Sequence, residues 1–130
     1  MRPDASREWI ETNGLGGYAF GTSAGFPTRR YHGLLIAARK PPVDRRMLFG
    51  HLLASIVRGG RHLPLDPFLE SDKSGCVSDF VREPFPTTIY RISGVTREIF
   101  MRHGHNTTVV RYRLDAKAKP VRLAVRIVPV

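Results

Sequence analysis

The stretch Val121-Arg122-Leu123-Ala124-Val125-Arg126-Ile127-Val128 alternates apolar residues with arginine and alanine. Successive side chains of a β-strand point to opposite faces, so the odd-numbered apolar side chains share one face and both arginines share the other. This period predicts a half-buried β-strand.

The residues upstream continue in the same way. Thr107 to Leu114 alternates with period two, and a loop from Asp115 to Pro120 joins it to the last strand. Thr87 to Ile92 and Val95 to Met101 flank Ser93-Gly94, a two-residue connection that suits a hairpin.

The N-terminal half gives a similar pattern. Arg46 to Val57 and Arg61 to Leu65 flank Gly59-Gly60, a second hairpin signal, and Arg30 to Ala38 is a more continuously apolar strand that we expect to be covered on both faces. Met47 to Ile56 also fits helical spacing, but Gly50 and the Gly-Gly turn favour a strand. Many short strands with regular turns predict an all-β fold, an antiparallel β-sandwich forming one domain over residues 1–130. An apolar strand at Val128 predicts that the sheet continues beyond the given sequence, so we expect the sandwich to be incomplete at its C-terminus.

Composition limits the function classes. The chain has 130 residues, 42% of them hydrophobic, and one cysteine, Cys76, which leaves no intrachain disulfide. The N-terminus lacks the apolar core of a signal peptide, and no apolar run reaches the roughly 18 residues of a membrane span, so we expect a cytoplasmic protein without a membrane partner. The net charge of +10 is distributed along the whole sequence, which favours arginines on solvated strand faces over a nucleic-acid interface.

A glycine-rich segment, Asn13-Gly14-Leu15-Gly16-Gly17-Tyr18, resembles a nucleotide loop only superficially. Thr22 stands where a P-loop needs its phosphate-binding lysine, and no acidic residue follows at the distance that a dinucleotide fold requires. Two interpretations stay open: a tight turn into a strand, or bare backbone lying against a sugar or a neighbouring domain.

Polar side chains cluster at Arg29-Arg30-Tyr31-His32, directly before an apolar strand. A guanidinium, a phenol and an imidazole can all bind hydroxyl groups, and Tyr31 and Trp9 could stack on a sugar ring. The alternative is that Tyr31 and His32 pack inside the protein while the arginines hold carbonyl or carboxylate groups.

No catalytic residues can be nominated from the sequence. Glycoside hydrolysis needs two facing carboxyl groups, but most acidic residues lie beside Pro, Gly, Ser or Lys, as solvated turn residues do. His103 and His105 have no evident third ligand, so we expect neither a metal ion nor a cofactor.

Taken together, Glu8 to Ala19 and Thr28 to Ala37 resemble the opening of the N-terminal domain of bacterial and archaeal glycogen-debranching enzymes, the amylo-α-1,6-glucosidases. The resemblance covers essentially the whole chain and implies a large, supersandwich-like β-sandwich. In that family the sandwich precedes an (α/α) helical barrel that carries the catalytic acid and base.

The resemblance implies a non-catalytic domain that supports the barrel, shapes the rim of the cleft and contacts α-glucan. It places Trp9, Asn13, Gly14, Gly16, Gly17, Tyr18, Arg29, Arg30, Tyr31 and His32 at the substrate or at the domain boundary. Two alternatives remain at this point: a stand-alone carbohydrate-binding sandwich and a basic nucleic-acid-binding β domain.

Overall fold

The computed structural model describes residues 4, 6–66, 79–91 and 93–128. These residues form eleven strands and no helix, so the all-β prediction is confirmed. Within the described ranges, therefore, no helix could cross a membrane. Cys76 and the last residue of the predicted strand Thr87–Ile92 lie outside the described residues.

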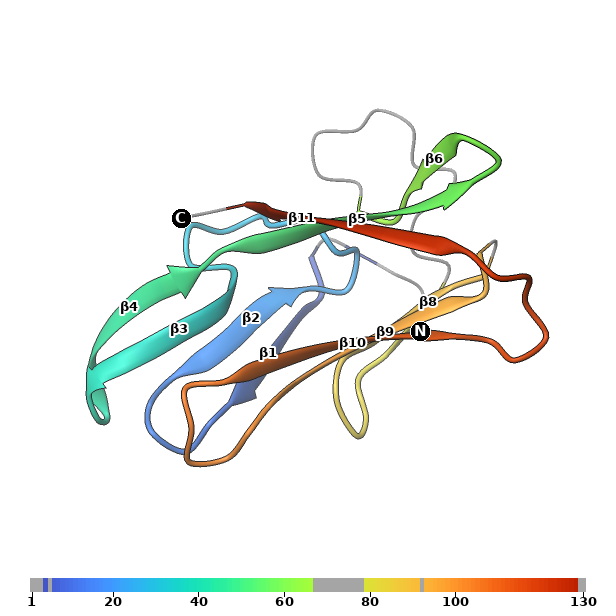
Figure 1. Cartoon of the computed structure of the whole chain (residues 1–130). Coiled ribbons are helices and arrows are strands. Elements are labelled where there is room, and N and C mark those ends of the chain that lie inside the picture. Colours follow the sequence, from blue (N-terminus) through green and yellow to red (C-terminus); the bar gives the residue numbers. More distant parts are fainter. Residues whose placement is uncertain (1–3, 5, 67–78, 92, 129–130) are drawn as a thin grey trace.

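The strands form three antiparallel sheets (Figure 1). The first sheet has the order β1-β2-β3-β4, with β1 (Glu8–Thr12), β2 (Tyr18–Thr22), β3 (Gly33–Lys40) and β4 (Val43–Phe49). The second has the order β10-β9-β8-β7, with β7 (Asp79–Val81), β8 (Thr87–Tyr90), β9 (Val95–Met101) and β10 (Thr108–Leu114). The third has the order β11-β5-β6, with β5 (His51–Arg58), β6 (Arg61–Pro64) and β11 (Arg122–Val128).

Both predicted hairpins form, but one predicted strand is divided. β8 pairs with β9 across Ser93-Gly94, and β5 pairs with β6 across Gly59-Gly60. The predicted strand Arg46–Val57 breaks at Gly50, where the chain leaves the first sheet and enters the third (Figure 1). The Gly50 carbonyl accepts a hydrogen bond from the Leu34 amide at 2.9 Å, which fixes the bend against β3. The helical alternative for Met47 to Ile56 is not seen.

The core lies on one face of the second sheet. One cluster joins that sheet to the first and contains Trp9, Ala19, Phe80 and Ile99; the other joins it to the third and contains Ala54, Ile56, Leu65, Tyr90 and Val95. Because Val95 and Ile99 lie on the same face of β9, the first and third sheets sit side by side over the second. This arrangement is a two-layer sandwich.

Arg97 departs from the expectation for arginines. It lies between Val95 and Ile99 on the inner face of β9, is 8% exposed, and forms an ion pair with Asp66 at 2.6 Å. Glu98 is also buried, because Arg111 and Arg113 of β10 both contact its carboxylate. The expectation that most acidic residues are solvated turn residues is therefore wrong for Asp66 and Glu98.

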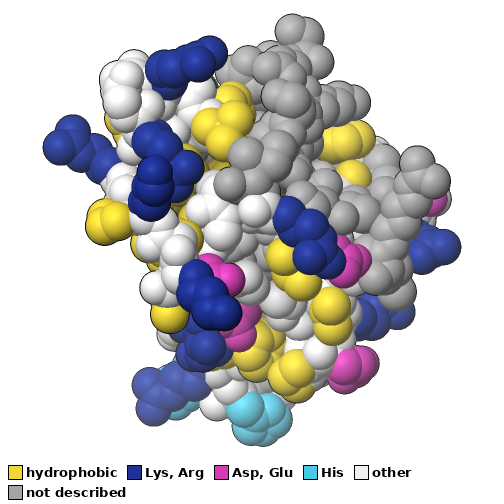
Figure 2. All heavy atoms as spheres, turned by 90° about the vertical axis from the view of Figure 1, so that its right-hand side faces the viewer, with side chains coloured by type: hydrophobic (Ala, Val, Ile, Leu, Met, Phe, Trp, Pro, Cys, Tyr) yellow, Lys and Arg dark blue, Asp and Glu magenta, His cyan; other side chains and the backbone are white. Residues whose placement is uncertain are grey.

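The remaining basic side chains are dispersed. Figure 2 shows Lys and Arg spread over the visible face, with acidic and apolar side chains between them. Arginines that pair with a carboxylate are Arg29, Arg39, Arg91, Arg97, Arg111 and Arg113. Among the described residues on this face, the basic side chains are therefore dispersed and do not form the concentrated stripe that is typical of a nucleic-acid interface.

β11 has the predicted position and alternation, but not the predicted burial. Leu123, Val125 and Ile127 are 36%, 44% and 62% exposed. Half-burial fails because these side chains lie at the edge of the third sheet, beyond the layer that would cover them.

Candidate functional site

The glycine-rich segment is the connection between β1 and β2. Gly14 and Gly16 have φ angles of 80° and 92°, which L-residues with a side chain rarely adopt. The Asn13 amide donates to the Gly17 carbonyl at 3.3 Å and closes the turn. The loop is therefore a tight hairpin connection with backbone angles that call for glycine.

Other parts of the chain close around this loop. A Cβ on Gly14 would lie 2.4 Å from the His103 ring, and one on Gly16 would lie 2.4 Å from the Pro42 carbonyl oxygen. Arg45 donates from Nε to the Gly16 carbonyl at 2.7 Å. The bare backbone is thus occupied by the β3–β4 and β9–β10 turns of the same chain.

Asn13 holds the arrangement together from a fully buried position. Its Oδ1 accepts the Leu15 and Gly17 amides at 2.9 and 3.1 Å, and its Nδ2 donates to the His105 carbonyl at 3.1 Å and to Asn106 Oδ1 at 3.0 Å. One side chain thus ties the β1–β2 turn to the β9–β10 turn. Of the two interpretations left open, this geometry favours the tight turn.

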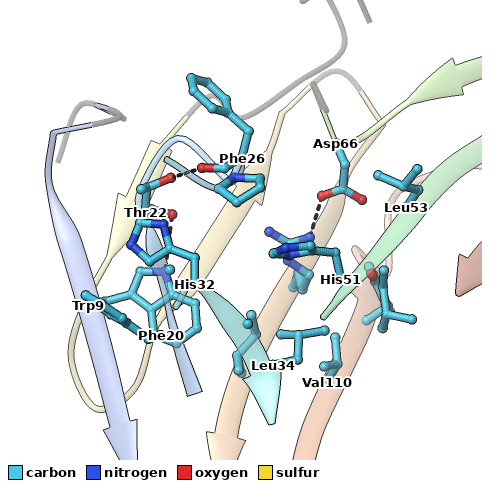
Figure 3. Close-up of a pocket in the computed structure, with 18 residues that line it drawn as sticks. Trp9, Phe20, Thr22, Phe26, His32, Leu34, His51, Leu53, Asp66 and Val110 are labelled. Atoms are coloured by element: carbon cyan, nitrogen blue, oxygen red, sulfur yellow. Dashed lines mark hydrogen bonds and ion pairs between the residues drawn. The ribbon is translucent and has the colours of Figure 1, made fainter. Parts of the chain in front are cut away.

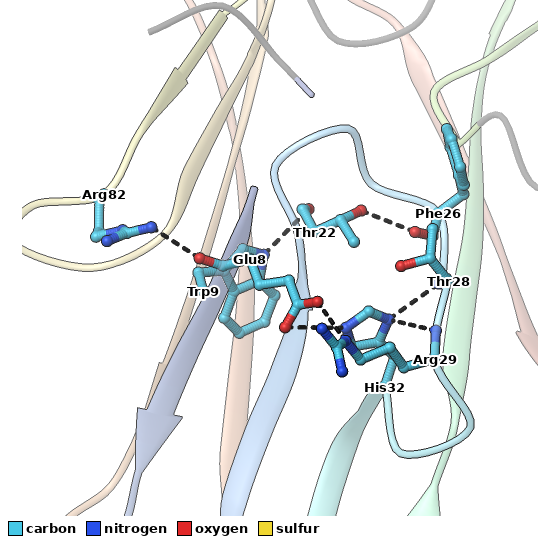
Figure 4. Close-up of polar contacts among 8 residues, drawn as sticks. All are labelled: Glu8, Trp9, Thr22, Phe26, Thr28, Arg29, His32 and Arg82. Atoms are coloured by element: carbon cyan, nitrogen blue, oxygen red, sulfur yellow. Dashed lines mark hydrogen bonds and ion pairs between the residues drawn. The ribbon is translucent and has the colours of Figure 1, made fainter. Parts of the chain in front are cut away.

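His32 is the centre of the second segment, the loop before β3 (Figure 4). It is buried, and its Nδ1 accepts the Thr28 and Arg29 amides at 2.9 and 3.0 Å. Nδ1 therefore carries no proton, and the neutral ring holds its proton on Nε2, which lies 4.0 Å from Glu8 Oε2. Phe20 contacts the ring edge-on at 4.5 Å between centroids.

The surroundings of His32 disfavour its charged form. Burial lowers the pKa of His32 below its usual range; the Glu8 carboxylate opposes this shift and the Arg29 guanidinium adds to it. Arg29 also forms an ion pair with Glu8, and Arg82 donates to the Glu8 carbonyl at 2.7 Å (Figure 4). His32 and Arg29 thus hold a loop together, as the packed alternative expected of them, but that alternative is wrong for Tyr31, which is exposed.

A neutral buried histidine makes stability depend on pH. The unfolded chain binds a proton at His32 near pH 6.5, whereas the folded chain resists it, so the free energy of unfolding is expected to fall as the pH drops from about 7 to about 5. His32→Asn keeps an acceptor near the Nδ1 position and removes the titration. We expect a shallower pH dependence in this variant, measured by urea unfolding across that range.

The matched control is His62→Asn, which makes the same substitution at an exposed position. His51, whose pKa burial also lowers, keeps some of the dependence in every variant. Equal slopes for the His32→Asn variant and the parent chain would contradict the assignment.

Arg30 and Tyr31 form the outer tip of this loop. Tyr31 is 62% exposed, and the Arg30 guanidinium carbon lies 6.0 Å from its ring centroid. Trp9, by contrast, is 7% exposed and donates from Nε1 to the Thr22 carbonyl at 3.2 Å. Trp9 is therefore not available to stack on a sugar in this structure, whereas the Tyr31 ring is. Tyr18 lies half-buried on β2 with its ring 6.3 Å from that of Phe20.

A cavity of about 50 Å³, partly open to solvent, lies between the layers (Figure 3). Its polar wall includes the Asp66–Arg97 ion pair, His32 and His51. Arg97 Nε and Tyr112 Oη are buried without a hydrogen-bond partner among the described residues. A water molecule occupies about 30 Å³ and ligand pockets measure about 300–1,000 Å³, so this cavity suits water and excludes a glucosyl unit.

Both the β1–β2 loop and the loop before β3 lie within a region that matches a known protein family. The family model described as "Glycogen debranching enzyme N terminal" matches residues 7–129. The chain belongs to this family. No curated protein and no solved structure matches the chain.

Hydrolysis by a debranching enzyme needs a catalytic carboxyl group, so the state of the carboxylates in this domain matters. Those at Glu8, Asp44, Asp66, Asp79 and Glu98 each pair with an arginine. An arginine partner favours the ionised form of a carboxyl, and a general acid needs the protonated form. The hydrogen bond from Arg111 lowers the pKa of Glu98, so Glu98 is poorly suited to protonate a leaving group.

Glu11 is an exception that the sequence did not indicate. Burial raises the pKa of Glu11, and the Glu83 carboxylate raises it further. Sequence reasoning missed this shift in pKa, because β1 and the β7–β8 connection are distant in sequence and meet only in the fold. Glu11 lines a groove with Glu8, Ile10, Phe20, Arg82 and Pro86.

Among the described residues, no group of three His, Cys, Asp or Glu side chains could hold a metal ion. His103 instead packs against Gly14, and the His105 carbonyl accepts from Asn13. Nothing in the sequence indicated this structural role, since the partners of His103 and His105 lie about ninety positions away.

Proposed function

We propose that this chain is a non-catalytic N-terminal domain of a debranching enzyme that acts on α-1,6 branch points of glycogen or a related α-glucan. It would pack against the catalytic helical barrel of the parent protein and contribute to the rim of the substrate cleft. The main support is that residues in the two family-matching segments make hydrogen bonds within the domain. The Asn13 side chain makes four such bonds, and the His32 side chain makes two. Residues used in this way shape a scaffold.

The pairing of Glu98 with Arg111 also supports a non-catalytic role, because it lowers the pKa of Glu98, whereas both inverting and retaining hydrolysis need a protonated carboxyl. The cavity beside Asp66 and Arg97 is too small for a sugar ring, since its volume of about 50 Å³ lies well below the roughly 300–1,000 Å³ of ligand pockets.

The purified chain is expected to release no glucose from a branched limit dextrin. Glu11→Gln and Glu83→Gln are the matched controls, because Glu11 is the described carboxyl with a raised pKa and Glu83 is the second carboxyl that raises it. The non-catalytic assignment would be overturned if the unmutated domain hydrolysed the dextrin and the Glu11→Gln variant did not.

For glucan contact, we propose the tip formed by Arg30 and Tyr31. Tyr31→Ala should weaken binding to maltodextrin about fivefold, or about 1 kcal/mol, because the exposed ring is lost as a stacking surface. Its unfolding free energy should stay within about 0.5 kcal/mol of the parent value, since the side chain is 62% exposed. Isothermal titration calorimetry and urea unfolding measure the two quantities.

Val43→Ala is the control, because Val43 is 58% exposed on a different loop boundary. Equal affinity of the Tyr31→Ala variant and the parent chain would remove Tyr31 from the proposed contact. Trp9→Ala is not a test of binding, because it removes a core side chain.

A further inference from the structure

The groove that contains Glu11, called the β1 groove below, lies where β1 meets the β7–β8 connection. Its volume is about 330 Å³. Ligand pockets measure roughly 300–1,000 Å³, so the β1 groove has room for a ligand, unlike the cavity beside Asp66 and Arg97. Its lining combines apolar side chains with two carboxylates and a guanidinium. Such a lining suits a ligand that has both polar and apolar faces.

Ile10 and Phe20 form the apolar part of the β1 groove. They lie directly opposite each other in the pairing of β1 with β2, so both side chains are on one face of the sheet. Ile10 is 55% exposed although its side chain is large and apolar. The two side chains together offer an apolar surface on which the C–H groups of a sugar ring can pack.

The backbone of β1 supplies polar groups to the same groove. The Asn13 amide donates to the Gly17 carbonyl, and bonded pairs alternate along an antiparallel ladder, so the odd-numbered residues of β1 bond to β2. The even-numbered residues therefore direct their N–H and C=O groups away from β2. Arg82 agrees with this direction, because it donates to the Glu8 carbonyl at 2.7 Å. Ile10 thus presents both backbone groups on the side of β1 that faces away from β2.

A polypeptide strand does not fit along this side of β1. An added strand needs a row of open backbone groups, and strands are usually three to ten residues long. Arg82 already occupies the Glu8 carbonyl (Figure 4), so only Ile10 and Thr12 of β1 keep outward backbone groups. A small ligand with several hydroxyl groups needs only such isolated donors and acceptors.

The charged side chains of the β1 groove can also bind hydroxyl groups. Glu8 and Glu11 provide acceptors, and the guanidinium of Arg82 carries N–H groups beyond the one that bonds the Glu8 carbonyl. Burial raises the pKa of Glu11, which indicates that water is partly excluded around this carboxyl. Glu8 also pairs with Arg29, so it lies between the groove and the loop whose tip carries Tyr31. The groove and the tip are therefore neighbouring parts of one surface.

We propose that the β1 groove is a second α-glucan subsite, which extends the contact at Tyr31. A glucosyl ring would pack on Ile10 and Phe20. Its hydroxyl groups would bond to the Ile10 backbone, to the two carboxylates and to the guanidinium. The carboxylates disfavour an anionic ligand, and a glucan chain is neutral. The choice of glucan rests on the proposed function.

The first test compares the affinity for maltohexaose of the unmutated domain and of Ile10→Ala by isothermal titration calorimetry. The variant should bind about fivefold more weakly, because the apolar surface is reduced. Leu48→Ala is the matched control, since Leu48 is 58% exposed on β4 of the same sheet and should keep full affinity. Both variants should unfold in urea within about 0.5 kcal/mol of the unmutated domain.

Two further measurements locate the ligand. Maltohexaose should shift the ¹⁵N amide signals of Ile10 and Thr12, because these amides face away from β2. Glu11→Ala should weaken binding about fivefold, and Glu11→Gln should weaken it less, because the side-chain amide keeps an acceptor oxygen.

The outcomes separate this subsite from the proposed function. Equal affinity of Ile10→Ala and the unmutated domain, or shift changes that leave out β1, would overturn the β1 groove as a subsite. If Tyr31→Ala still weakened binding in that case, the contact at Tyr31 would stand alone. If the unmutated domain failed to bind maltohexaose, both the groove and the contact at Tyr31 would be overturned, whereas the non-catalytic assignment depends on the hydrolysis assay.

Discussion

Asp66→Ala is expected to lower the free energy of unfolding by about 3–5 kcal/mol, as measured by urea unfolding. Asp66 is 5% exposed and Arg97 8%, so removing the carboxylate leaves a guanidinium in the interior without its counter-charge. Burial lowers the pKa of Arg97 and the Asp66 carboxylate raises it, but the pKa of an arginine lies so far above neutral that the guanidinium stays charged even when Asp66 is removed. The same substitution also removes the acceptor of the Ala54 amide, at 2.7 Å from Oδ2.

Two controls separate this effect from the general cost of losing an ion pair. Arg39→Ala removes an exposed pair with Asp44, in which Arg39 Nε and Asp44 Oδ2 are 3.7 Å apart, and should cost less than about 1 kcal/mol. The double variant Asp66→Leu/Arg97→Met replaces both charges by apolar groups and should recover much of the loss, because no buried charge remains. A loss of under about 1 kcal/mol for the Asp66→Ala variant would show that Arg97 is not confined to the interior.

Arg97 also shows where sequence reasoning stops. The period of β9 was correct, but a period-two pattern cannot say which face is inside when both faces carry charge, as Arg97 and Glu98 do. The burial of Arg97 depends on Asp66, thirty-one positions away, and this partner becomes visible only in the fold.

The strands themselves were more accessible to prediction. Local alternation and glycine turns indicated the hairpins at Ser93-Gly94 and Gly59-Gly60 because both signals act within a few residues. The break at Gly50 was missed, since an apolar run reads as one strand whether or not it passes between sheets. The candidate site was likewise predictable only in its local features. The sequence indicated both segments, but the residues that contact them, such as His103 and Pro42, belong to distant turns.

Gly16→Ala is expected to lower the free energy of unfolding by about 3–5 kcal/mol, again measured by urea unfolding. Two costs combine: a φ of 92° strains any residue with a side chain by about 1–3 kcal/mol, and the new methyl group adds a clash that costs about 1–3 kcal/mol more. The clash is severe because the group that the Cβ would meet at 2.4 Å is the Pro42 carbonyl oxygen. Backbone cannot rotate aside as a side chain can, so the β3–β4 turn itself must shift.

Gly60→Ala separates the two costs. Gly60 has a φ of 75°, but nothing lies within 4 Å of the position that a methyl group would take there, so this variant should show the strain alone, about 1 kcal/mol. If both variants lose the same stability, the contact with Pro42 contributes nothing and the glycine is required only for its backbone angle. A larger loss of stability in the Gly16→Ala variant means that the β3–β4 turn packed against the loop leaves no room for a side chain. Gly16 would then be required for this packing as well as for its backbone angle.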